Sequence, residues 1–352
     1  MRAERWTAFF FALLWTTCVY GENRGGSVSG RILDAVTGEK LAFTNVFLAK
    51  TTIGDAADEE GFYLLENVPP GVYEIVYSRV GYQVQVKEIR VAPLSRITID
   101  IDLRSNPIEG EEVSVEAPSP RQWRRDLKRF TRIFLGESKN AELCEIINPE
   151  VLDFYREPIT KYFYASTDEI LVVENRALGY RIRLVLKEFR WHSVKLGMFF
   201  FYPLFLELEP KNDAERIKWQ KARKRTYLGS FRHFLASLAL DLTLEEGFDI
   251  YRDERGTGTS WRIDVPFPIT PDSTLIRDAD TDGRLKKLKF KGRLIVVYRP
   301  TSKTSSFTLT RDSLQFDLYG NVHTEHAFKV SGEWSGHRVA DMLPLNYWPG
   351  VD

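Results

Sequence analysis

The sequence predicts two folded parts, an all-β sandwich on the N-terminal side and an α+β domain behind it. Three observations support this fold class. Short apolar runs separated by glycine and proline turns fill residues 27–104. A proline-bounded acidic segment, 105–122, follows and is typical of a linker. From 123 to 352, strand-like runs alternate with two stretches of helical spacing, and 352 residues suffice for two cores.

Residues 1–21 are predicted to be an export signal peptide. Arg2 and Arg5 precede an apolar run, 6–15, that is too short to span a bilayer. We expect cleavage after Gly21; the alternative is that Cys18 becomes the lipid-bearing first residue of a lipoprotein. No later run is long and apolar enough for a transmembrane helix. The expected location is therefore the periplasm or the outer membrane, with secretion as the further alternative.

Six short runs form the predicted sandwich. Several of them alternate apolar with polar residues, which places one face of each strand on a core and the other in water. Glycine-containing turns separate them, and no helical pattern intervenes. This spacing indicates two antiparallel sheets packed face to face. The runs are residues 28–33, 44–48, 61–65, 73–77, 84–86 and 97–101.

Four blocks of turns and strands follow one another in this region: Gly30–Asp34 with Thr37–Glu39, Asp58–Tyr63, Val68–Tyr73 and Val80–Tyr82. In these blocks the chain resembles the carboxypeptidase regulatory-like domain, a transthyretin-like sandwich. Ala57 stands where that family often has threonine. The resemblance implies an accessory module of peptidases, transporters or envelope proteins, in some cases with a carbohydrate-binding-like fold, and no catalysis by the domain itself.

The second domain opens with a helix on which Trp123, Leu127, Phe130 and Phe134 share one face. Its charged residues, Asp126 among them, are assigned to the solvated faces. A hairpin is predicted for the strands 170–175 and 180–186. A second helical region covers 211–244, with a kink at Gly229-Ser230, and further strands follow between 248 and 318.

Several motifs of this second region are distinctive: 134–138 with 140–141, 147–152, 174–180, 227–235 and 343–347. In these motifs the region is similar to a companion region that follows the regulatory-like domain in some Gram-negative envelope proteins. That resemblance implies no established activity.

Composition and cysteine content restrict the possible partners. Forty-nine basic and 49 acidic residues give a formal net charge of +0, so there is no electrostatic reason to expect nucleic acid as a partner. If Cys18 leaves with the signal peptide, Cys144 is alone and no internal disulfide forms. Leu143 and Ile146-Ile147 around it predict a buried, inert thiol rather than a nucleophile.

No enzyme and no cofactor are predicted. A zinc carboxypeptidase needs a His-x-x-Glu pair, and none of the five histidines has glutamate three residues on. There is no Gly-x-Ser-x-Gly elbow, and the glycine-rich 256–260 lacks the lysine of a phosphate-binding loop. His323 and His326 with Glu325 are interpreted as exposed loop residues rather than a metal site.

Three aspartates provide one weak metal candidate. Asp278, Asp280 and Asp282, followed by glycine, have the spacing that begins a calcium loop. Lys289 occupies the place of the bidentate glutamate, however, so an acidic turn is the favoured interpretation and calcium the alternative.

The function predicted from these observations is that of a non-enzymatic, exported cell-envelope protein that acts as a binding or scaffolding module. Its expected partner is an envelope protein or a cell-surface polysaccharide. The alternative is a carbohydrate-binding accessory protein of a glycan-processing or uptake system, in which exposed aromatic rings stack on sugars. An exposed row of these rings favours the alternative, and inward-pointing rings favour the scaffold; the candidates are Tyr63, Tyr77, Tyr82 and Trp261.

Overall fold

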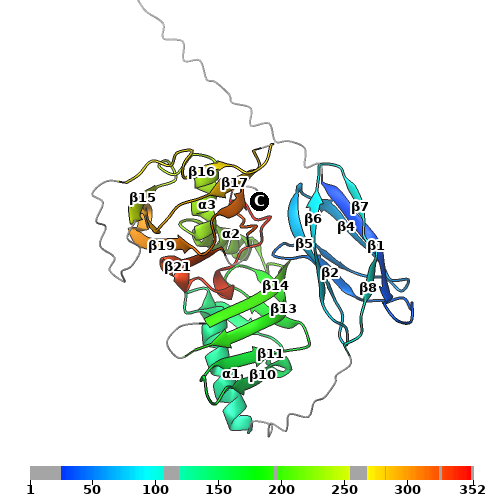
Figure 1. The fold of residues 1–352 in the computed structure, drawn as a ribbon. Helices are drawn as coiled ribbons and strands as arrows, with labels where there is room; N and C mark the ends of the chain where they lie inside the picture. The colour runs from blue at the N-terminus through cyan, green and yellow to red at the C-terminus, as the bar shows by residue number, and fades with distance from the viewer. Residues whose placement is uncertain are drawn as a thin grey trace, which may run out of the picture.

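The protein consists of a β-sandwich beside an α+β domain that itself has two lobes, as Figure 1 shows. The computed structural model describes residues 25–106, 119–192, 197–253, 268–281, 283–324 and 327–349. The predicted signal peptide, with the lipid candidate Cys18, and most of the linker lie outside these ranges. Within them, no helix has the length and apolar character that crossing a membrane requires.

The sandwich has two sheets around a core that contains Val28, Ile32 and Ile75. Five of the six predicted runs coincide with strands, because alternation and turn glycines are local signals. The sixth, 97–101, is divided between β7 and β8, and β3 lies in no predicted run. The pairing also differs: β1 is antiparallel to β4 but parallel to β7 and β8, so the first sheet is mixed rather than antiparallel. That sheet holds β4 (Phe62–Val68), β1 (Gly26–Asp34), β7 (Arg96–Thr98) and β8 (Ile101–Leu103). The second is antiparallel and holds β3 (Gly54–Ala56), β2 (Asn45–Leu48), β5 (Gly71–Ser78) and β6 (Gln85–Val91).

The α1 lobe, residues 120–227, packs α1 against an antiparallel sheet. Phe130 and Phe134 are buried as predicted, and Trp123 and Leu127 are half-buried. The predicted hairpin forms β12 and β13, which also pairs with β14. The helices are α1 (Pro120–Leu135), η1 (Ala141–Leu143), η2 (Pro149–Val151) and α2 (Asp213–Tyr227). The strands are β9 (Cys144–Ile146), β10 (Asp153–Arg156), β11 (Phe163–Ser166), β12 (Leu171–Asn175), β13 (Tyr180–Trp191) and β14 (Gly197–Glu207).

Asp126 corrects the assignment of charged residues on α1. The residue is only 3% exposed; its carboxylate accepts a hydrogen bond from Gln122 Nε2 at 2.6 Å and forms an ion pair with Arg156. A buried carboxylate needs such partners. Helical periodicity alone could not reveal them, because Arg156 comes from β10.

The α3 lobe, residues 231–334, has its own core of Phe234, Phe307, Phe316 and Trp334. The expected kink of the helical region is a complete break: α2 ends at Tyr227, Gly229 has φ +77°, and the Ser230 hydroxyl caps α3 (Phe231–Ala239). One sheet holds β15 (Phe248–Asp253), β18 (Arg293–Tyr298), β19 (Lys303–Leu309) and β21 (Phe328–Gly332). The other holds β16 (Ile276–Asp278), β17 (Leu285–Leu288) and β20 (Leu314–Asp317). The 3-10 turn η3 (Arg299–Thr301) lies within this lobe, η4 (Glu333–Gly336) begins at its end, and η5 (Val339–Asp341) belongs to the tail that follows. The sandwich and the α+β domain together confirm the predicted fold class.

The C-terminal tail, residues 337–349, connects all three parts. Val339 packs in the core of the α1 lobe, and Asn175 Nδ2 donates to the Ala340 carbonyl at 2.9 Å. Further on, the Leu345 N–H donates to the carbonyl of Lys50 in the sandwich at 2.7 Å. The tail therefore crosses from one lobe to the other and then reaches the sandwich.

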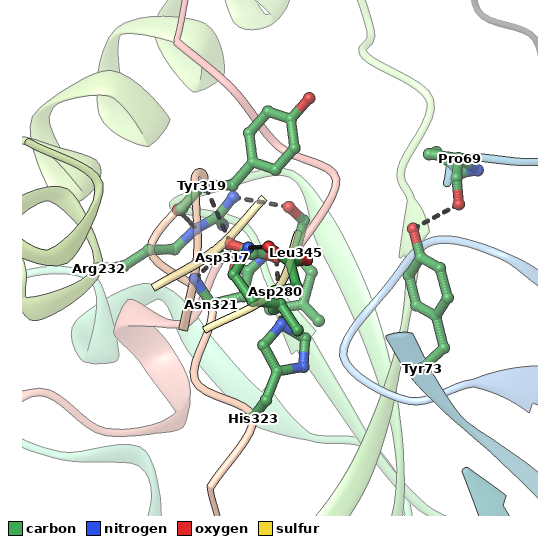
Figure 2. Close-up of polar contacts among 10 residues, drawn as sticks. Pro69, Tyr73, Arg232, Asp280, Asp317, Tyr319, Asn321, His323 and Leu345 are labelled. Carbon is green, nitrogen blue, oxygen red and sulfur yellow. Dashed lines mark hydrogen bonds and ion pairs between the residues drawn. The ribbon is translucent and has the colours of Figure 1, made fainter. Parts of the chain in front are cut away.

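Arg232, on α3, holds this tail in place. Figure 2 shows its guanidinium between the tail and the turn at Tyr319. Nε donates to the Tyr319 carbonyl at 3.2 Å, Nη1 to Pro344 at 2.7 Å, and Nη2 to Leu345 and Tyr347 at 2.6 and 2.7 Å. The turn approaches α3 closely because Gly320, at φ +77°, has no side chain; a Cβ there would lie 2.1 Å from the Arg232 carbonyl oxygen.

The outer face of the sandwich packs on the sheet of the α1 lobe. Phe47 and Val76 from the sandwich form one buried cluster with Val185, Tyr202 and Leu204 from β13 and β14. The expectation that the second face of each strand meets water is thus wrong for β2 and β5. Their alternate residues are buried on both sides, because two sheets pack face to face here.

The loop 49–53 strengthens this contact by extending the edge of β14. The Lys50 N–H donates to the Pro203 carbonyl at 2.6 Å, and the Phe205 N–H donates to the Thr51 carbonyl at 2.9 Å. Arg183 Nη2 also donates to Asn45 Oδ1 at 2.8 Å. The sandwich is therefore held against the α+β domain by these hydrogen bonds as well as by the covalent linker.

Candidate functional site

A cleft of about 1170 Å³ lies between the α1 lobe and the α3 lobe. We call it the interlobe cleft. Its walls are the C-terminal end of α1, the segment 136–140, the end of α2 and parts of β18 and β19. The segment from η4 to η5 lines it where the chain crosses between the lobes. It therefore lies where elements distant in the sequence meet.

Glycine at position 136 brings two of these walls together. Gly136 ends α1 with φ +94°, a backbone angle that L side chains rarely adopt. A Cβ at this position would lie 2.9 Å from the Arg338 Cβ. The end of α1 can thus approach the chain crossing directly, which brings Arg338 to the wall of the cleft.

Basic side chains outnumber acidic ones along the interlobe cleft. Two of the three acids already have basic partners: Glu333 pairs with Lys303, and Glu137 lies 3.9 Å from Arg132. The basic residues are Arg129, Arg132, Lys139, Arg225, Lys303 and Arg338, and the acids are Glu137, Glu333 and Asp341. The local charge is positive although the whole chain is neutral, which favours an anionic ligand.

A polar network surrounds Asp341. Its Oδ1 accepts from Ser138 Oγ at 2.8 Å and from Asn140 Nδ2 at 2.9 Å, and Asn140 also donates to Thr226 Oγ1 at 3.0 Å. The second carboxylate oxygen, Oδ2, is buried without a hydrogen-bond partner. A buried acceptor without a donor is costly, so this oxygen is suited to a donor supplied by a ligand.

Two neighbours of this network shape the rest of the wall. Burial lowers the pKa of His337 below its ordinary value, which favours the neutral imidazole. The guanidinium carbon of Arg338 lies 5.9 Å from the ring centre of the half-buried Trp191. The cleft thus combines cations, neutral hydrogen-bonding groups and an aromatic ring.

The tyrosines proposed to stack on sugars do not form an exposed row. Tyr63 and Tyr77 are 2% and 0% exposed, and their hydroxyls meet at 2.8 Å inside the sandwich core. Tyr82 donates to Asp34 Oδ2 at 3.0 Å. Trp261 lies outside the described residues. The register of β4 and β5 turns the rings of Tyr63 and Tyr77 into the core, and alternation along the sequence alone does not determine that register.

Two of the three aspartates of the calcium candidate, Asp278 and Asp280, lie in the described residues. Asp278 forms an ion pair with Lys286, and Asp280 Oδ1 accepts the Leu285 N–H at 3.1 Å. Asp282 lies outside the described residues. No group of three or more potential metal ligands occurs in the ranges that the structure covers.

The candidate histidine patch is only partly visible. His323 lies 3.4 Å from the Asp317 carboxylate, as Figure 2 shows, whereas Glu325 and His326 are outside the described residues. Asp317 mainly organises its own turn, accepting the Tyr319 and Asn321 N–H groups at 2.9 Å. These contacts describe a structured turn.

Cys144 is half-buried, and its Sγ donates to the Asn140 carbonyl at 3.3 Å. Burial raises the pKa of the thiol to about 12, so it is a poor nucleophile near neutral pH. The apolar residues around Cys144 are not all buried as predicted, however. Leu143, which ends η1, and Ile147, which follows β9, are 48% and 46% exposed, and of the three only Ile146, on β9, is buried.

Comparison with known families identifies the N-terminal part. Residues 28–115 match the model of the CarboxypepD_reg-like domain. The N-terminal sandwich is a carboxypeptidase regulatory-like domain. This regulatory-like domain contributes Phe47 and Val76 to the interdomain cluster, whereas the interlobe cleft belongs to the chain beyond the match. No curated protein matches the chain.

Several solved structures are similar to parts of this chain, with low sequence identity and low TM-scores. A type II cohesin–X-dockerin complex from Acetivibrio cellulolyticus is similar at 20% identity and TM-score 0.19, over 22% of this chain and 53% of that one. The TIE protein of Bacillus anthracis is similar at 16% identity and TM-score 0.21, over 23% and 17%. A candidate carbohydrate binding protein from Bacteroides uniformis is similar at 12% identity and TM-score 0.19, over 52% and 79%.

Two functional features are not evident from the sequence. The interlobe cleft joins residues such as Asn140 and Asp341, which are 201 positions apart. Arg232 reaches a carbonyl 115 positions away. The residues that make these contacts lie in or near three of the motifs that resemble the companion region, 140–141, 227–235 and 343–347. That resemblance was the one sequence signal that could have pointed to them.

Proposed function

We propose that this chain is an exported cell-envelope protein that acts, without enzymatic activity, as a binding or scaffolding module. The observation that carries the proposal is the way in which the regulatory-like domain is fixed to the α+β domain. Phe47, Val76 and Leu204 share one buried cluster, and loop 49–53 lies between β14 and the tail. Such a contact presents both domains to a partner as a single surface.

The physical reason is the cost of ordering on binding. A tethered domain loses freedom when a partner contacts it and its neighbour together, whereas a docked domain has lost that freedom during folding. Thr51 is fully buried and Asn346 Nδ2 donates to Thr52 Oγ1 at 2.7 Å, so both sides of the loop are held. This preorganisation supports binding or scaffolding as the role.

Export is tested by fractionation of the native host with mass spectrometry of the mature N-terminus. A free Glu22 start in the periplasmic, outer-membrane or secreted fraction is the expected result. An acylated Cys18 in the membrane fraction would replace this form with an anchored lipoprotein. An intact Met1 in the cytoplasm would contradict the proposal. Cross-linking in intact cells then identifies the partner. If the Leu204→Ala variant no longer cross-links to that partner, the docked arrangement of the two domains is needed for binding.

The second candidate function is that of a carbohydrate-binding accessory protein. Its original basis, stacking on the sandwich tyrosines, is weakened because Tyr63 and Tyr77 point inward. The interlobe cleft supports the same function at another place, since it combines polar groups with Trp191. Binding of glycans to the purified protein tests this candidate.

A further inference from the structure

We propose that the interlobe cleft binds an acidic oligosaccharide, a short chain of sugar units that carry carboxylates. This inference rests on the proposed function as a binding module and names its ligand. The ligand class follows from the charge, the hydrogen-bonding groups and the size of the cleft.

The charge calls for several anionic groups. Four cations that line the cleft form no ion pair with a carboxylate of the described residues. They come from separate walls: Arg129 from α1, Lys139 from the segment behind it, Arg225 from α2, and Arg338 from the tail. Guanidinium groups match carboxylates in a planar, two-point geometry. Cations on different walls suit charges repeated along a chain better than one isolated anion.

The buried carboxylate calls for hydrogen-bond donors on the same ligand. Asp341 Oδ2 has no partner, while Oδ1 is already occupied by Ser138 and Asn140. A fully deprotonated anion, such as a carboxylate or sulfate, offers no donor and would be repelled by this carboxylate. A sugar hydroxyl donates one hydrogen bond and carries no charge, so an acidic sugar satisfies both the cations and Asp341.

Size and aromatic content agree with a chain of sugars. Pockets for single small ligands usually enclose about 300–1000 Å³, and the interlobe cleft, at about 1170 Å³, exceeds that range. Trp191 lines the cleft beside Arg338, where its ring can pack against the C–H face of a sugar. The geometry therefore favours an oligomer over a monosaccharide.

Calorimetric titration of the full mature chain with short oligogalacturonides tests the proposal. We expect binding that weakens as salt rises, because exposed cations contribute. Fully methyl-esterified oligomers of the same length keep the hydroxyls and lose the charges, and should bind at least about tenfold more weakly. Oligoglutamate of equal charge tests the acidic peptide as the other source of carboxylates. Equal affinity for oligoglutamate or for the ester would overturn the proposal.

Variants locate the site. Arg225→Gln, on the exposed end of α2, should weaken binding about tenfold, because one charged contact is lost. Arg216→Gln lies on the same helix, outside the cleft, and is the matched control, with unchanged affinity. Asp341→Asn should also weaken binding, with its melting temperature recorded because Asp341 has structural contacts as well. Wild-type protein that binds no oligogalacturonide, or Arg225→Gln that binds normally, would refute the site. If either result occurs while the protein is exported as proposed, the binding or scaffolding function is not contradicted, and only the acidic oligosaccharide as its ligand is refuted.

Discussion

Replacing Arg232 by alanine is expected to detach the C-terminal tail and to destabilise the whole chain. The guanidinium donates four hydrogen bonds of 2.6–3.2 Å to backbone carbonyls of Tyr319, Pro344, Leu345 and Tyr347. A hydrogen bond to a charged group contributes about 1.5–3 kcal/mol. Water can reach some of the released carbonyls, which offsets part of the sum, so we expect a loss of about 3–5 kcal/mol. That is a large share of the stability of about 5–15 kcal/mol that is usual for a native protein.

Urea unfolding and native-state hydrogen exchange provide the assay. The variant should unfold at lower urea, and the Leu345 amide, which donates to the Lys50 carbonyl, should lose protection first. The amide of Phe248, which donates to the Thr243 carbonyl at 2.7 Å within the α3 lobe, should lose less. Lysine at position 232 should give an intermediate loss, because one ammonium cannot reach carbonyls in four directions. Arg216→Ala, on the exposed side of α2, is the control and should cost under about 1 kcal/mol.

Two outcomes would refute this reasoning. A loss below about 1 kcal/mol would mean that the four contacts have no net effect on folding. Unchanged protection of Leu345 would mean that the tail is held by other contacts. Gly320→Ala offers an independent check, because its Cβ would meet the Arg232 carbonyl oxygen at 2.1 Å and should release the same region.

Three further predictions follow from the packing and from the pKa shifts. Leu204→Ala should cost about 2–5 kcal/mol and should loosen the regulatory-like domain in limited proteolysis, whereas Leu206→Ala, 38% exposed on the same strand, should not; equal effects would contradict the interdomain cluster. Stability should fall as pH decreases below about 6.5, because burial lowers the pKa of His233 and of His337 in the folded chain, so the unfolded chain binds more protons there. A urea midpoint that is equal at about pH 7.5 and about pH 5.5, roughly one unit either side of that value, would oppose this sign. Burial raises the pKa of the Cys144 thiol to about 12. At pH 8 the thiol should therefore react with a thiol reagent about three orders of magnitude more slowly in the folded chain than in urea, and comparable rates would show an accessible thiolate.

Local patterns were sufficient where neighbouring residues decide the structure. Alternating residues and turn glycines predicted the sandwich strands, since a strand's two faces follow directly from a period of two. Helical spacing located α1 and placed Phe130 and Phe134 in its core. The turn 176–179 between β12 and β13 followed in the same way, because a short connection restricts its strands to antiparallel pairing.

The surroundings of individual side chains were not available from such patterns. Asp126 was assigned to solvent, but Arg156 from another strand makes its burial possible. Tyr63 and Tyr77 were candidates for an exposed row, but strand register turned them inward. In each case the deciding contact comes from a segment distant in the sequence, which a local period cannot specify.

The sequence by itself determined the fold class and the regulatory-like domain, because both depend on residue spacing within short segments. Tertiary structure alone decided that the sandwich is docked through Phe47 and Leu204, and that Arg232 holds the tail. It also decided that basic residues from both ends of the second domain meet in one cleft of a neutral chain. The physical reason is that charge and hydrogen bonding act over a few ångströms in space, whatever the separation along the chain.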